Sequence, residues 1–128
     1  MAANTIPIFP LAARFEVATI NNSDTTSKKL LFTAGIDGSR INSIGVSSTD
    51  TAAATIMFYL SKDSGSTFYL LGTIAISAAY QGLVQSGIPC FDSSKGIAIP
   101  VSASIYVAAL ATVTADKTLN FSALGSDY

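Results

Sequence analysis

Histidine and tryptophan are absent from this chain of 128 residues, cysteine occurs once, and charged residues are scarce. Without histidine, the chain lacks the commonest general base, the usual partner of a serine or cysteine nucleophile, and the most frequent transition-metal ligand. The single cysteine, Cys90, forms neither an internal disulfide bond nor a thiolate metal cage. The sequence therefore predicts a protein that is not an enzyme and has neither cofactor nor metal.

The shortage of charge also limits the class of partner. Charged residues make up 12% of the chain, against about 25% in a typical soluble domain, and the net charge is −1. Only Lys28 and Lys29 form an adjacent basic pair, so neither a nucleic-acid partner nor an electrostatic membrane anchor is expected. Hydrophobic residues reach 49%, which excludes an intrinsically disordered chain.

The N-terminal residues do not have the pattern of a targeting segment. A secretory signal begins with basic residues and continues with an apolar run, whereas here Arg14 is the first basic residue and Pro7 and Pro10 interrupt the run. No apolar stretch is long enough for a membrane-spanning helix. We therefore expect synthesis in the cytoplasm without a signal peptide, and no membrane partner.

The hydrophobic pattern is that of β-strands. In Thr55–Leu60, three apolar side chains alternate on one face (Ile56, Phe58 and Leu60), and the turn-forming segment 62–66 follows. The apolar pattern then resumes in Thr67–Leu71 and Thr73–Ile76, which predicts a β-hairpin with a bulge or kink at Gly72.

Six further segments have strand-like alternation. They are Arg14–Ile20, Lys29–Thr33, Arg40–Ser47, Gly96–Val101, Ser104–Val113 and Lys117–Leu124. A one-residue slip between Ile41 and Ile44 predicts a bulge in the third of these. The stretch Ile76–Leu83 is compatible with a helical turn around its two alanines.

About eight short strands at this spacing predict an all-β, single-domain antiparallel sandwich. Jelly-roll-like and immunoglobulin-like connectivity both fit the pattern, and the jelly-roll is the one that we predict. Residues 1–13 are expected to form an extended N-terminal arm and residues 14–128 the sandwich.

Several predicted strands are apolar on both faces, which is unusual for a two-layer sandwich with wet outer surfaces. Met57 and Tyr59 occupy the second face of one strand, and Tyr106 lies on the second face of another. Large apolar surfaces mark interfaces. The pattern therefore favours a subunit that associates with itself or with a larger assembly over a monomeric sandwich with a Ser/Thr-rich exterior.

Other candidate sites have simpler explanations. Ser61 and Ser94 each adjoin a lysine, but neighbouring strand residues point to opposite faces, which argues against a serine–lysine pair. The loop aspartates, without an acidic pair at ligand spacing, are typical of turn-capping residues rather than of a calcium site. The tyrosines would suit a sugar-stacking platform, although tyrosine is also common in strands and at interfaces.

Four segments together resemble a group of short tailed-bacteriophage virion proteins. They are Asn4–Pro10, Phe32–Ile41 leading into Ile44, Ile97–Pro100 followed by Ile105–Val107, and Gly125–Tyr128. The resemblance implies a capsid decoration, or cement, protein, which binds the outer surface of an icosahedral head and bridges capsomers. It further implies a homotrimer whose partners are its own copies and the major capsid protein, located in the virion. The alternative is a glycan- or host-surface-binding module of a phage tail or fibre.

The N-terminal arm supplies a mechanism for docking. Pro7 and Pro10 favour extended backbone at the residues that precede them, and an arm of seven residues reaches at most about 25 Å. We expect the arm to insert into a groove on a neighbouring subunit; the alternative is that it covers the edge of its own sheet. The candidate interface residues are Ile6, Pro7, Ile8, Phe9, Pro10, Met57, Tyr59, Tyr106 and Tyr128.

Overall fold

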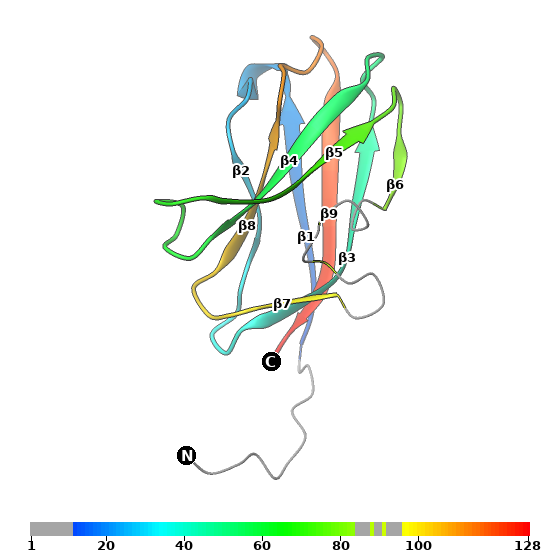
Figure 1. Ribbon diagram of the computed structural model, residues 1–128. Helices are drawn as coiled ribbons and strands as arrows, with labels where there is room; N and C mark the ends of the chain where they lie inside the picture. The colour runs from blue at the N-terminus through cyan, green and yellow to red at the C-terminus, as the bar shows by residue number, and fades with distance from the viewer. Residues whose placement is uncertain (1–11, 84–87, 89–90, 92–95) are drawn as a thin grey trace, which may run out of the picture.

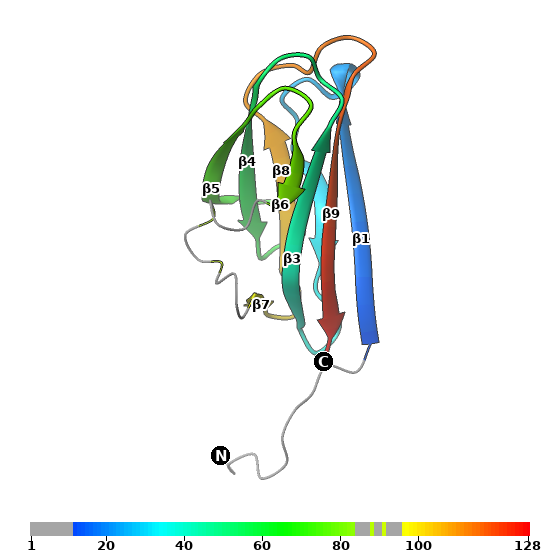
Figure 2. The same ribbon diagram turned by 90° about the vertical axis from the view of Figure 1, so that its right-hand side faces the viewer.

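The computed structural model describes residues 12–83, 88, 91 and 96–128, which form two packed antiparallel sheets (Figures 1 and 2). The strands are β1 (Ala12–Asn21), β2 (Lys29–Thr33), β3 (Ser39–Ser48), β4 (Ala54–Ser61), β5 (Tyr69–Ile76), β6 (Gln81–Leu83), β7 (Ile97–Ile99), β8 (Ser104–Ala109) and β9 (Thr118–Asp127). One short 3-10 helix, η1 (Asn22–Asp24), follows β1. The predicted all-β sandwich is confirmed.

The strand order is that of a jelly-roll. Sheet A has the order β1-β9-β3-β6, with β7 added beside β3, and sheet B has the order β2-β8-β4-β5. The pairs β1–β9, β2–β8, β3–β6 and β4–β5 are nested along the chain, as in a long hairpin rolled into two layers. Segments at opposite ends of the sequence therefore lie side by side in sheet A.

The core lies between the inner faces of the two sheets. Phe58 of β4 and Phe121 of β9 are both almost fully buried, and their rings meet edge to face across the layers at a centroid distance of 6.2 Å. Ile20, Ile44 and Ile105 complete this layer from neighbouring strands. Alternation at a period of two residues places these side chains inward.

Two predicted irregularities are present. In β3, the register with β9 shifts between Ile41 and Ser43, where the sequence slips by one residue. In the hairpin of β4 and β5, the register shifts after the pair formed by Phe58 and Gly72. The hairpin and both bulges agree with the sequence analysis.

The helical turn considered for Ile76–Leu83 is wrong. Ala78 and Ala79 form a turn, and Gln81–Leu83 is a strand that pairs with Gly45–Ser47 of β3. Pairing with a strand more than thirty residues earlier overrides the local helical preference of the alanines. The strand predicted for Ser104–Val113 ends earlier, at Ala109.

The predicted arm at residues 1–13 falls mostly outside the described residues. Residues 1–11 are among those not described, and Ala12 and Ala13 belong to β1, where they pair with Asp127 and Ser126.

Candidate interaction surface

The outer face of sheet A exposes large apolar side chains on three of its strands. Phe15 and Val17 of β1 are 61% and 65% exposed, Leu83 of β6 is 61% exposed, and Leu124 of β9 is 47% exposed. The inward positions of β1 instead include Ala18 and Ile20, which are buried. In β1, therefore, two of the larger apolar side chains face solvent.

Two of these side chains, Val17 and Leu83, line a groove that also includes the small residues Gly45 and Ser122. Val17, Ser122, Gly45 and Leu83 lie in one row across β1, β9, β3 and β6. The two outer strands of this row are about 14 Å apart, because neighbouring strands are about 4.8 Å apart. The groove is therefore wide enough to hold an extended segment between Val17 and Leu83.

Three consecutive rows of this face contain no ionisable side chain among the described residues. They are Phe15–Leu124–Ser43, Val17–Ser122–Gly45–Leu83 and Thr19–Asn120–Ser47–Gln81. The last row is polar, and Thr19 Oγ1 donates a hydrogen bond of 2.9 Å to Asn120 Oδ1. Covering this face removes no charge from water, which avoids the large desolvation penalty of an ion, whereas its polar side chains would need hydrogen-bond partners. We call these three rows the uncharged face.

The outer face of sheet B brings together three of the predicted interface residues. Met57, Tyr59 and Tyr106 are all half-buried, and the Tyr59 hydroxyl donates to Met57 Sδ at 3.2 Å. Phe68, at the end of the β4–β5 loop, contacts both tyrosine rings edge to face, at 6.1 Å and 5.0 Å. The hairpin therefore covers part of the apolar second face that the sequence analysis assigned to a partner.

Lys28 also contacts this aromatic cluster and reduces the ring surface that is open to a ligand. Its ammonium group lies 4.9 Å from the ring centroids of both Tyr59 and Phe68. A sugar would stack on these aromatic rings, but parts of their faces and edges already contact other side chains of the same chain. Leu30 and Leu70, at the two edges of the same row, remain exposed.

The other predicted interface residues are not part of this cluster. Tyr128 follows β9 in sheet A, is half-buried, and donates its backbone N–H to the Gly38 carbonyl oxygen at 3.2 Å. Residues 6–10 lie outside the described residues.

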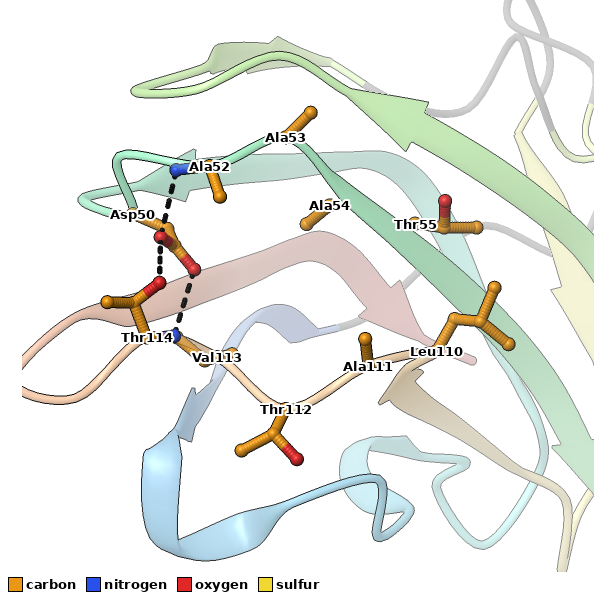
Figure 3. Close-up of a pocket in the computed structure, with 10 residues that line it drawn as sticks. All are labelled: Asp50, Ala52, Ala53, Ala54, Thr55, Leu110, Ala111, Thr112, Val113 and Thr114. Carbon is orange, nitrogen blue, oxygen red and sulfur yellow. Dashed lines mark hydrogen bonds between the residues drawn. The ribbon is translucent and has the colours of Figure 1, made fainter.

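A cavity of about 250 Å³ opens beside the β3–β4 and β8–β9 connections (Figure 3). Asp50 is 4% exposed and is the acidic residue of its lining, which otherwise consists mainly of alanine, threonine and apolar side chains. The Asp50 carboxylate accepts hydrogen bonds from the Thr114 hydroxyl at 2.7 Å, the Ala52 N–H at 3.0 Å and the Thr114 N–H at 3.1 Å.

These hydrogen bonds favour the ionised form of Asp50. The Thr114 hydroxyl, followed by the backbone N–H groups of Ala52 and Thr114, lowers the pKa of Asp50 below its usual value. A carboxylate whose oxygens are both occupied by donors from the chain connects two loops rather than acting on a ligand. Asp50 therefore has a structural role at this cavity.

A second polar cluster closes the opposite end of the sandwich. Arg14 forms ion pairs of 2.8 Å with both Glu16 and Asp127, and its guanidinium lies 4.5 Å from the centroid of the Phe32 ring in sheet B. The Ser39 hydroxyl and then Arg14 lower the pKa of Asp127. This cluster holds the two sheets together where the apolar core ends.

Within the described part of the chain, no three His, Cys, Asp or Glu side chains gather closely enough to hold a metal ion. No described helix is long and apolar enough to cross a membrane. Cys90 and Ser94 lie among the residues that are not described.

The residues of the uncharged face were not among those predicted from the sequence. A signal was present in Arg14–Ile20, where apolar residues occur at both odd and even positions. Such a pattern shows that one apolar set must face outward, but not which one.

Comparison with models of known protein families gives no match, and comparison with curated protein sequences gives none either.

Proposed function

We propose that this chain is a virion structural protein, a decoration or cement subunit that binds the outer surface of an icosahedral phage head. The observation that carries this proposal is the uncharged face of sheet A, on which Phe15, Val17, Leu83 and Leu124 are exposed and a groove lies between Val17 and Leu83. Exposed apolar side chains gathered on one face mark a protein interface. The jelly-roll is also common among viral capsid domains, although fold alone does not assign function.

The size of the uncharged face indicates how it would act. Four strands and three rows cover roughly 400 Å², since strands are about 4.8 Å apart and alternate residues about 6.8 Å apart. A stable interface buries about 800 Å² on each partner. A single contact through this face would therefore be weak, and stable attachment would require additional contacts or several linked copies.

The proposed assembly would provide both additional contacts and several linked copies. A homotrimer held together through such faces would present three copies of its remaining surface to a repetitive shell of the major capsid protein, and simultaneous binding would multiply the affinity of each contact. The sequence resemblance to decoration proteins supports the same role. The candidate residues Tyr59, Tyr106 and Tyr128 would contribute at other subunit contacts.

Sedimentation with phage heads tests this proposal. The full chain is mixed with purified heads of the phage whose genome encodes it, and with heads of an unrelated phage as the control. We expect saturable co-sedimentation with its own heads and retention of DNA at temperatures where undecorated heads release it. A chain that stays at the top of the gradient with its own heads would contradict the proposal.

A further inference from the structure

We propose that the groove on the uncharged face binds the N-terminal segment, residues 4–11, of a neighbouring copy of this chain. The proposal deepens the proposed function, on which it relies for the expectation that copies associate. It identifies the surface that receives the segment and the origin of the segment.

The chemistry of the segment matches that of the groove. Residues 1–11 contain no charged side chain, and Ile6, Ile8, Phe9 and Leu11 supply apolar groups. The groove likewise lacks charge in its described lining, and Val17 and Leu83 form its apolar sides. Burying these side chains against one another removes apolar area from water without stranding an ion.

The prolines favour the face of the sheet over its edge. Alternate residues of a strand added at a sheet edge donate their backbone N–H groups to the sheet; Pro7 and Pro10, three positions apart, cannot both face away from it, and neither has an N–H to donate. Docking on the face uses side chains instead, so the prolines cost nothing there. A residue that precedes proline disfavours the helical region, so Ile6 and Phe9 would lose less conformational entropy on binding in an extended form.

The start of β1 favours a neighbouring copy over the same copy. β1 pairs with β9 without a break down to Ala12, so the chain enters the sheet along the strand direction, at the end of the sheet. To reach its own groove, the segment would have to reverse immediately and return about 17 Å to the row of Val17. The eight residues 4–11 span up to about 28 Å, and continuing along the strand direction carries them away from their own groove without that reversal.

This contact is heterologous, since segment and groove are different surfaces. Where the rotation between copies closes, such contacts form a ring, of which a cyclic trimer is one example. Each copy would then give one segment and receive one.

Two full-length variants test the proposal. The first, Ile8→Asp combined with Phe9→Asp, damages the segment; the second, Val17→Asp, damages the groove. The matched control is Val101→Asp, which makes the same substitution at an exposed valine (54%) in the turn between β7 and β8. Circular dichroism and thermal melting check that all three variants fold.

Light scattering over a dilution series measures the oligomer. We expect the wild type and the control to associate, and each damaged variant to lose at least about tenfold in association constant, because an ionised carboxylate would enter an apolar contact. Mixing the two damaged variants should restore one intact joint and produce dimers, since one supplies the segment and the other the groove.

Three results would overturn the proposal: a wild-type chain that is monomeric throughout the series, damaged variants with wild-type mass, or no dimer on mixing. Should either damaged variant unfold, Ile8→Ser with Phe9→Ser and Leu83→Asp take their places in the same assay. Binding to heads is measured separately. A chain that binds heads as a monomer would refute this inference and leave the proposed function standing.

Discussion

Asp50→Asn is the change that most directly tests the role of the loop-connecting carboxylate. Asp50 is 4% exposed and accepts three hydrogen bonds, two from Thr114 and one from Ala52. Asparagine has one acceptor oxygen and an NH2 group that cannot accept, so at least one donor loses its partner. Loss of a hydrogen bond to a charged group costs about 1.5–3 kcal/mol.

The corresponding change in melting temperature follows from the chain length. The entropy of unfolding is about 2.1 cal/mol/K per residue, or about 0.27 kcal/mol/K for 128 residues. A loss of 1.5–3 kcal/mol therefore lowers the Tm by about 6–11 °C. Differential scanning calorimetry at neutral pH measures it, with Asp116→Asn, an exposed loop position with positive φ, as the control.

The pH dependence provides an independent check. Because the pKa of Asp50 in the folded chain is lower than its unfolded value, ionisation stabilises the fold above the unfolded pKa. That contribution is lost as the pH falls from the unfolded pKa, about 3.9, through the folded one. The Tm difference between wild type and Asp50→Asn should therefore be constant near neutral pH and shrink below about pH 4. A Tm within 1 °C of the wild type, or a difference that does not depend on pH, would refute this account.

Two further predictions concern the sandwich itself. A double-mutant cycle of Phe58→Leu and Phe121→Leu, measured by urea unfolding, should give a coupling of about 0.5–1.5 kcal/mol, because the rings meet edge to face across the sheets; additive effects would contradict it. Gly125→Ala should destabilise the fold severely, because the added carbon would overlap the Arg40 carbonyl oxygen, whereas Gly45→Ala meets a side-chain hydroxyl and should be much milder. Thermal melting of the two variants compares them, and equal melting temperatures would refute the steric argument.

Local pattern was sufficient to predict most strands. Alternation and turn residues placed the hairpin of β4 and β5, and a slip in that alternation between Ile41 and Ile44 located the bulge in β3. These features depend on residues a few positions apart, so the sequence carries them directly.

The sequence did not show on which face of its sheet each side chain lies. Phe15 and Val17 of β1 face outward although they are larger than Ala18 on the inner face. The register of β1 with β9 decides which alternate set of β1 side chains points into the core. Likewise, the contacts of Phe68 with Tyr59 and Tyr106 required the folded hairpin.

The sequence by itself determined a strand-rich chain with few charged residues and no histidine. The tertiary structure alone decided where its apolar surface lies. Val17, Gly45, Leu83 and Ser122 are far apart along the chain and become one groove through three strand pairings. Those pairings form between distant segments, so their register depends on the packing of the whole sandwich rather than on any local pattern.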